Sequence, residues 1–242
     1  MTEALFRDDA YRRECAARIV DVGEAGIVLD RSVFYPLGGG QAGDTGVLTL
    51  ESGATVAIAD TRKGEAGCIL HVPPAGQDLA ALRPGARVTA AIDWPRRHRL
   101  MRLHTTTHLL CALLPYPVNG CSITPEQARM DFDTAEPFDA TAVEAGLARL
   151  VAEAHAVGTQ WISDEELDAN PQLVRTMSVA PPRGSGRVRL LRIEGVDRQP
   201  CGGTHVASTA EIGGVRVLKI EKKGARARRI VLGLAETAAL SA

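Results

Sequence analysis

The spacing of apolar residues along the chain changes once, near residue 93. Before that point, short apolar runs are separated by glycine, proline and polar residues, as is typical of strands joined by turns. The runs are residues 17–20, 26–29, 47–50, 55–58, 68–70 and 87–92. Short strands at this spacing predict a compact all-β domain over residues 1–93, with a barrel-like sheet.

Helical periods begin after residue 93. Apolar positions recur every three or four residues after Pro95, which suits the first turn of a helix. A second period over residues 140–157 predicts another helix, capped by Asp139 and ended by Gly158. Residues 188–193 are strand-like, and residues 215–232 predict two strands joined near residues 223–225. We therefore predict a second domain over residues 94–242, of the α+β class with an antiparallel sheet.

Two pairs of potential metal ligands share one spacing. His104 and His108 are four apart within the first predicted helix, so they lie on one face of it. Cys201 and His205 flank Gly202 and Gly203, which favour a tight turn after a strand. Three imidazoles and one thiolate are the ligands that zinc prefers. The sequence therefore predicts one zinc site built from a helix and a loop.

The role of that site is open at this point. Four protein ligands are typical of structural zinc, whereas a chain of 242 residues can bury a core without a metal. No glutamate lies between His104 and His108, so the metalloprotease pattern is absent.

Three sequence blocks resemble known editing motifs. Residues 102–110 (RLHTTTHLL) and 199–206 (QPCGGTHV) are similar to the editing-site motifs shared by alanyl-tRNA and threonyl-tRNA synthetases. Residues 34–46 (FYPLGGGQAGDTG) resemble the glycine-rich motif of the alanyl branch. The resemblance extends over nearly the whole chain. It indicates the free-standing alanyl-tRNA editing proteins of the AlaX family, in the longer form that keeps the glycine-rich domain.

The resemblance implies an ATP-independent hydrolase that deacylates mischarged tRNA(Ala) and spares Ala-tRNA(Ala). A synthetase pocket cut for a methyl group cannot strongly reject a side chain that only adds a hydroxyl, so serine is the expected error. Ser-tRNA(Ala) is the expected substrate, and Gly-tRNA(Ala) is a second candidate. Zinc would either activate a water or hold the substrate's amino group, and the sequence does not choose between these catalytic roles.

Six side chains are candidates for contact with the amino acid. The resemblance implies that Gln41 is a polar group lining the pocket. The other candidates are hydroxyl side chains near the ligands, whose alternative role is ordinary packing: Thr105, Thr106, Thr107, Ser122 and Thr124.

The chain carries a formal charge of −1, so RNA binding would need locally gathered basic residues. Such residues occur in two segments, although a charge cluster is often only a solvated surface. The candidate RNA contacts are Arg96, Arg97, Lys222, Lys223, Arg226 and Arg228. With only three Tyr, four Phe and two Trp, base stacking on aromatic side chains is not expected.

The remaining features predict a cytoplasmic monomer that does not enter a membrane. The five cysteines are irregularly spaced, and the first residues do not resemble a signal peptide. Two other classes remain open. One is a small-molecule zinc hydrolase, and the other is a non-catalytic tRNA-binding module with a structural zinc.

Overall fold

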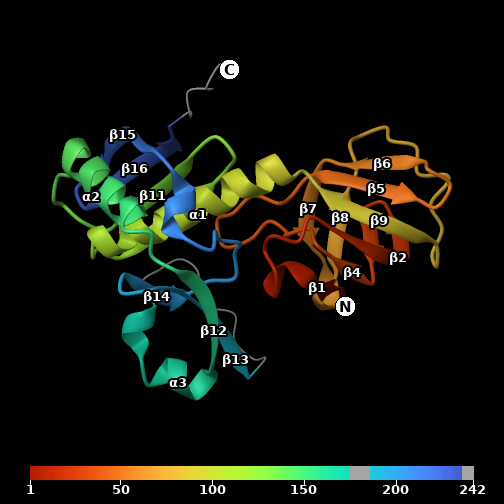
Figure 1. Cartoon of the computed structure of the whole chain (residues 1–242), viewed down its shortest axis with the longest axis horizontal. Coiled ribbons are helices and arrows are strands. Elements are labelled where there is room, and N and C mark those ends of the chain that lie inside the picture. The colour runs from red at the N-terminus through yellow and green to blue at the C-terminus, as the bar shows by residue number, and fades with distance from the viewer. Residues whose placement is uncertain (175–185, 236–242) are drawn as a thin grey trace. The chain divides into compact units, whose positions relative to one another are not determined.

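The computed structural model describes residues 1–174 and 186–235 (Figure 1). The chain forms two compact units, Met1–Arg99 and Leu100–Ala242. The boundary between them falls inside helix α1 (Trp94–Leu113). Antiparallel sheets with few helices confirm the predicted α+β class. The predicted functional division at residue 93 stays a prediction.

The first unit is built on a seven-stranded sheet in the order β6-β5-β9-β2-β3-β8-β7, coloured red to yellow in Figure 1. All its pairings are antiparallel. The strands are β2 (Glu14–Gly23), β3 (Gly26–Leu29), β5 (Gly46–Leu50), β6 (Thr55–Ile58), β7 (Asp60–Lys63), β8 (Ile69–Val72) and β9 (Arg87–Ile92). The two short strands β1 (Glu3–Ala4) and β4 (Arg31–Ser32) pair in parallel beside the 3-10 helices η1 (Leu5–Arg7) and η2 (Glu65–Gly67).

Strand β2 joins the two halves of this sheet. It pairs with β9 over Glu14 to Arg18 and with β3 from Ile19 onward, and its register shifts between Ile19 and Asp21. Such a bulge bends a strand and increases its twist. The sheet of this unit ends at edge strands β6 and β7, so it is open, whereas the sequence predicted a barrel-like sheet.

All six apolar runs of the first unit lie in or overlap strands. Strand β9 buries Val88, Ala90 and Ile92, whereas Thr89 is exposed and Ala91 is half-buried, as alternation leads one to expect. Strand β7 was not predicted, because its sequence DTRK is polar and it lies at a sheet edge.

The glycines of residues 34–46 have local structural roles. Gly39 and Gly40 adopt φ of +57° and +83° in a tight turn, a conformation that glycine reaches without strain. A Cβ on Gly46 would lie 2.2 Å from the carbonyl oxygen of Ala91 on the neighbouring strand β9.

The second unit contains two antiparallel sheets. The four-stranded sheet has the order β10-β11-β16-β15, and the three-stranded sheet has the order β12-β13-β14 (Figure 1). Their strands are β10 (Val118–Ile123), β11 (Ala128–Phe132), β12 (Val157–Ser163), β13 (Arg187–Ile193), β14 (Asp197–Pro200), β15 (Val215–Gly224) and β16 (Ala227–Leu234). The other helices are α2 (Ala140–Ala152), α3 (Asp164–Asp168), and the 3-10 helices η3 (Pro171–Leu173) and η4 (Thr209–Ile212).

Helix α2 begins as predicted but ends earlier. The Asp139 carboxylate accepts the backbone N–H of Ala142, which confirms the N-cap. The prediction that the helix continues to Gly158 is wrong. It ends at Ala152, Ala154 adopts φ of +54°, and strand β12 begins at Val157.

Helix α1 is buried on nearly all sides over its second half. Every residue from Leu100 to Cys111 is buried except Arg102, which is half-buried. A helix enclosed on all sides provides a buried environment for polar groups, and His104 and His108 lie in this stretch.

Candidate metal centre

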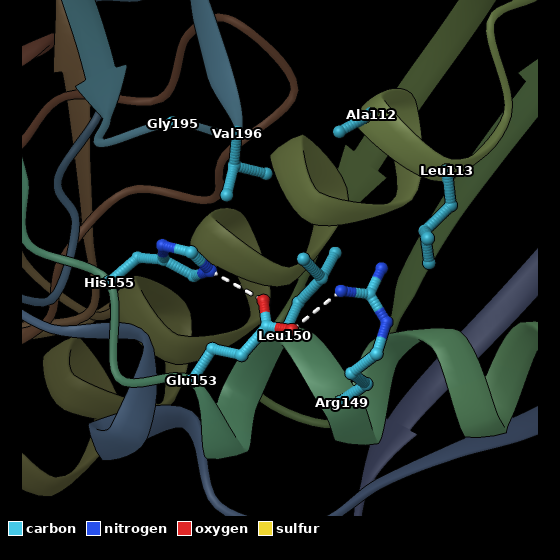
Figure 2. A pocket seen from close by; sticks show the side chains of 8 residues that line it. All are labelled: Ala112, Leu113, Arg149, Leu150, Glu153, His155, Gly195 and Val196. Atoms are coloured by element: carbon cyan, nitrogen blue, oxygen red, sulfur yellow. Dashed lines mark hydrogen bonds and ion pairs between the residues drawn. The ribbon is translucent and has the colours of Figure 1, made fainter.

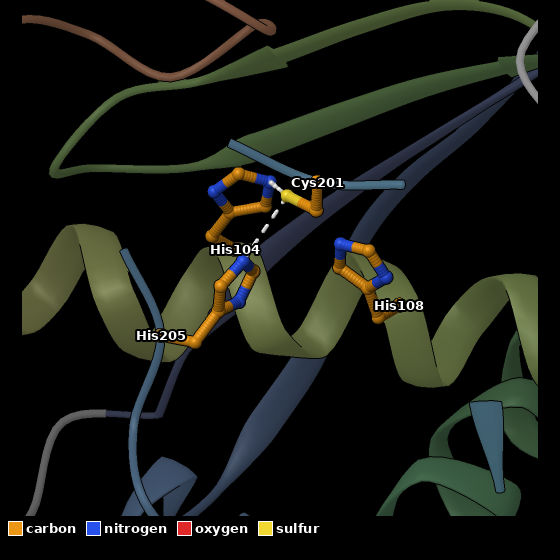
Figure 3. Close-up of side chains that lie close together, drawn as sticks. All are labelled: His104, His108, Cys201 and His205. Atoms are coloured by element: carbon orange, nitrogen blue, oxygen red, sulfur yellow. Dashed lines mark hydrogen bonds between the residues drawn. The ribbon is translucent and has the colours of Figure 1, made fainter. Parts of the chain in front are cut away.

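Four side chains from two distant segments meet in the second unit. His104 and His108 project from α1, and Cys201 and His205 lie in the loop that follows β14. One ligand atom from each residue lies within 4.8 Å of all the others. The Cys201 sulfur is 3.5 Å from Nε2 of His104 and 3.2 Å from Nε2 of His205, and Figure 3 shows the His108 ring one turn further along the helix. The structure therefore places the four predicted ligands around one point.

A carboxylate and an amide hold the His108 ring from behind. Nδ1 of His108 lies 3.0 Å from Oδ2 of Asp197, and the same oxygen accepts from Nε2 of Gln199 at 2.7 Å. Both partners are buried. A proton donated from Nδ1 to Asp197 leaves Nε2 available to a metal, which is the usual arrangement behind a ligating histidine.

Thr105 performs the same task for His205. Its hydroxyl donates to the Met101 carbonyl, so its oxygen can accept from Nδ1 of His205 at 3.2 Å and from the backbone N–H of Val206 at 3.3 Å. Nε2 of His205 then faces the Cys201 sulfur. Thr105 therefore fixes the orientation of this ring.

Arg189 fixes the loop that carries Cys201. Its Nη1 donates to the carbonyl oxygens of Cys201 at 2.8 Å and Gly203 at 3.1 Å. The backbone N–H of Cys201 in turn donates to the Arg189 carbonyl at 3.1 Å. The glycine-rich turn is thus tied to strand β13.

The electrostatics favour a thiolate at the centre. Burial opposes charge on Cys201, yet His104 and His205 lower the pKa of its thiol well below its ordinary value. Burial lowers the pKa of His205 to about 3, which keeps its imidazole neutral. Burial also disfavours charge on His108, but hydrogen bonds to Asp197 and Cys201 raise its pKa to about 9. Cys201 as a thiolate and His205 as a neutral imidazole already have the forms that bind metal ions, whereas His108 would release a proton when a metal binds.

The donor set and its spacing fit a zinc ion. Ligands of tetrahedral zinc lie roughly 3.3–3.6 Å apart, given Zn–N of about 2.0–2.1 Å and Zn–S of about 2.3 Å. The two sulfur-to-nitrogen distances of 3.5 and 3.2 Å match this spacing. Ligand atoms up to 4.8 Å apart would need to approach by about 1 Å, which side-chain rotation supplies. The cluster can thus hold a metal ion and is compatible with zinc.

The hydroxyl candidates differ in what their oxygens do. Thr106 and Thr107 donate to helix carbonyls, at Arg102 and His104 respectively, so their oxygens can only accept from a ligand. Thr124 bonds backbone groups of residues 126 and 127 and shapes the turn between β10 and β11.

Ser122 lies half-buried on β10, and its role as a contact for the amino acid stays a prediction. Gln41 lies buried in the first unit, where its backbone pairs with Gly38, and its role as a pocket-lining group stays a prediction.

The six candidate RNA contacts differ in exposure, and the prediction that Arg97 contacts RNA is wrong. Its side chain is 0% exposed, because it donates to both oxygens of Asp44 and to the carbonyls of Ala10 and Val33. A guanidinium enclosed in this way supports the fold of the first unit. Arg96 is half-buried, with one bond to the Gly43 carbonyl.

The other four basic candidates lie at the β15–β16 hairpin. Lys222 and Lys223 are exposed near its tip. Arg226 is exposed but pairs with Asp133 at 3.3 Å, and Arg228 donates to three carbonyls, of Gly224, Ala227 and Ala135. The two lysines are therefore the better candidates for phosphate contact.

Asp197, Gln199 and Arg189 are functional candidates that sequence reasoning missed. A signal was present, because Asp197 and Gln199 on β14 and Cys201 directly after it alternate and so share a face. The alternation identifies nothing until the strand is known to pass beside His108.

A separate surface hollow of about 230 Å³ lies at the C-terminal ends of α1 and α2 (Figure 2). Its charged residues neutralise one another. The Glu153 carboxylate accepts from Arg149 at 2.6 Å and pairs with His155 at 2.7 Å, and His155 and Arg149 lower its pKa.

Comparison with known proteins places the chain among tRNA synthetase-related proteins. Residues 188–231 match the family described as the threonyl and alanyl tRNA synthetase second additional domain, and residues 3–96 match class II (A) tRNA synthetases. The chain is 36% identical to an alanine–tRNA ligase of Metallosphaera sedula, over 91% of this chain and 25% of the ligase. No helix in the described part of the chain is long and apolar enough to cross a membrane.

Two shorter relatives match from end to end. The alanyl-tRNA editing protein AlaX-M of Saccharolobus solfataricus is 33% identical over 95% of this chain and 98% of its own length. The AlaX-M protein of Methanosarcina mazei is 35% identical over 98% of both chains. The chain belongs to the AlaX-M family of alanyl-tRNA editing proteins.

Proposed function

We propose that this protein is an aminoacyl-tRNA deacylase that hydrolyses mischarged tRNA(Ala), with Ser-tRNA(Ala) as its main substrate and zinc as its metal. The observation that carries the proposal is the cluster of His104, His108, Cys201 and His205, oriented by hydrogen bonds from Asp197 and Thr105. The near full-length similarity to named alanyl-tRNA editing proteins supports the substrate class.

The residues of the site have three proposed roles, which are to hold the metal, to orient its ligands and to contact the substrate. His104, His108, Cys201 and His205 would hold the ion, and zinc would supply a Lewis acid for ester hydrolysis. Asp197 holds the Nδ1 proton of His108, and Thr105 holds that of His205, so both rings keep the tautomer that binds metal. Thr106 and Thr107 are the remaining hydroxyl candidates on α1, where each oxygen could accept a hydrogen bond from the seryl hydroxyl.

Specificity follows from hydrogen bonding. A buried site that pairs with the seryl hydroxyl would be left with unpaired polar groups when alanine binds. Such a site can reject alanine by roughly a thousandfold or more, which a methyl-sized cavity cannot achieve. Glycine lacks the hydroxyl and is smaller than alanine, so Gly-tRNA(Ala) is the less favoured candidate.

The β15–β16 hairpin is the proposed contact for the tRNA backbone. Lys222 and Lys223 are exposed there, and each phosphate contact releases counterions on binding. Charge reversal at both lysines should weaken tRNA binding and flatten its salt dependence, with much less effect on a minimal serine ester. Equal losses on both substrates would indicate a role in folding.

A deacylation time course on Ser-, Gly- and Ala-charged tRNA(Ala) tests the function. We expect rapid release of serine, little release of alanine, and loss of activity in the Cys201→Ala variant. A small-molecule hydrolase would be insensitive to added tRNA, and a non-catalytic module would bind tRNA without releasing an amino acid. Equal rates on Ser- and Ala-tRNA(Ala) would contradict the proposed specificity.

A further inference from the structure

The three-stranded sheet β12-β13-β14 has one covered face and one face directed toward the metal cluster. On the covered face, Ile162, Val188 and Leu190 pack with Leu167 of α3. On the other face lie Asp197, which bonds His108, and Gln199, which donates to Asp197. The two faces alternate along each strand, so the position of any further residue follows from the register.

Register places Trp161 in the same row as Cys201. Trp161 of β12 pairs directly with Arg189 of β13, and the Cys201 N–H donates to the Arg189 carbonyl from the other side. The row Trp161–Arg189–Cys201 therefore crosses the sheet, and its side chains share the face of Gln199. Two strand spacings separate its ends, so the backbones of Trp161 and Cys201 lie about 10 Å apart.

Trp161 is exposed, unlike most large aromatic side chains. It is 42% exposed, and the guanidinium carbon of Arg187 lies 4.6 Å from its ring centroid. Arg187 is itself exposed. The chain's other tryptophan, Trp94, is less exposed and packs against Tyr11 and His98. A flat aromatic ring backed by a cation, on the face that carries Cys201 and Gln199, is suited to stacking against a planar base.

We propose that the Trp161–Arg187 pair binds the base of the terminal adenosine of the aminoacyl-tRNA. The inference rests on the proposed function and adds a binding residue to it. Only the ribose separates the ester from that base, so a base stacked about 10 Å from Cys201 brings the ester to the cluster. The 3′ end is single-stranded, and unpaired bases are recognised by stacking. The few aromatic residues argued against stacking, but one ring at the right place in the row is sufficient.

Fluorescence tests the platform without any reaction. Because the chain has two tryptophans, the Trp94→Phe variant reports Trp161 alone. Titration of the zinc-loaded variant with the ribonucleotide ACCA should give saturable quenching, and Arg187→Ala in the same background should weaken the binding. A blunt-ended RNA duplex should quench far less. Absence of quenching by ACCA, or equal quenching by the duplex, would overturn the proposal.

The KM for Ser-tRNA(Ala) tests the Trp161 platform independently of fluorescence. Trp161→Ala should raise KM for Ser-tRNA(Ala) about 5- to 100-fold, far beyond any change with serine methyl ester, and Trp161→Phe should recover much of the loss. The control Val20→Ala removes another exposed apolar side chain, 53% exposed on β2, and should leave both substrates unaffected. Metal content confirms that each variant is intact. An unchanged KM in Trp161→Ala would reject the platform alone, whereas a parent protein that releases no serine from tRNA would reject the proposed function.

Discussion

His71 in the first unit and His205 in the second are both buried, but their ring nitrogens are used differently. Nδ1 of His71 bonds the Ile27 carbonyl at 3.0 Å, and Nε2 bonds the Ser32 hydroxyl at 2.7 Å. In His205, Nδ1 is held by Thr105, and Nε2 points at the Cys201 sulfur. Burial therefore does not distinguish a functional histidine. The distinguishing feature is a ring held on one side, with its second nitrogen directed toward other metal-binding atoms.

Ser32 and His71 also show why residue type alone misleads. A serine in contact with a histidine resembles a nucleophile with its base. However, both side chains are 0% exposed, and Ser32 accepts the Phe34 N–H at 3.0 Å. A substrate has no access to this hydroxyl, so the pair stabilises the turn after β4.

The buried carboxylates show the same contrast. Asp44 accepts hydrogen bonds from the Arg97 guanidinium and, at 2.6 Å, from the Tyr35 N–H. All these partners lie within the first unit, so this carboxylate has a structural role. Asp197 bonds His108 and Gln199, and through His108 it reaches the metal cluster. The Asp44 carboxylate supports the fold of the first unit, and the Asp197 carboxylate orients a side chain of the candidate metal site.

The largest expected effect comes from one substitution made in both histidines. His205→Gln should lose its bound zinc and nearly all deacylation, about a thousandfold or more, because a ligand and its Lewis acid are removed together. His71→Gln should keep about one zinc per chain. Metal analysis and Ser-tRNA(Ala) deacylation measure both. Zinc lost from both variants, or from neither, would remove the distinction between the two histidines.

The next effect is on stability in the first unit. Arg97→Ala should lower the free energy of unfolding by about 3–5 kcal/mol, because it leaves the buried Asp44 carboxylate without its cation. The matched control is Arg62→Ala, which breaks the exposed pair with Asp60 and should cost under about 1 kcal/mol. Urea denaturation measures both variants. Similar losses would show that the Arg97 pair is no more than a surface contact.

A smaller effect is expected at Asp197. Asp197→Asn should weaken zinc affinity about 10- to 100-fold, because the partner of His108 loses its charge while its size is kept. Chelator competition at fixed pH gives the affinity. Asp133→Asn changes a more exposed carboxylate paired with Arg226 in the same unit and serves as the control. Equal zinc affinity in parent and Asp197→Asn would mean that the carboxylate only supports packing.

The sequence predicted what depends on local periodicity. Alternation located strands such as β9, and ligand spacing identified the cluster of His104, His108, Cys201 and His205. Polar segments at sheet edges, such as β7, carry no apolar alternation and were missed.

Long-range contacts explain the remaining errors. Arg97 is charged and lies near other arginines, so its sequence resembles a solvated surface, and only the fold reveals Asp44 across a separation of 53 residues. Asp197 and Trp161 likewise acquire meaning from the register of β12-β13-β14. Neither strand pairing nor burial is encoded within a short window of sequence.

The smallest effect concerns pH. Burial lowers the pKa of His71 from 6.5 to about 4, so between these values the unfolded chain binds a proton that the folded chain does not. Stability attributable to His71 is thus full above pH 6.5 and is lost as the pH falls toward 4. From about pH 7 to about pH 5.5 the loss should be about 1 kcal/mol. His71→Gln keeps hydrogen-bonding groups but cannot titrate, so its unfolding free energy, measured by urea denaturation, should fall less over this interval. Parallel pH profiles for the parent and the variant would show that His71 is not the buried neutral group that its two hydrogen bonds indicate.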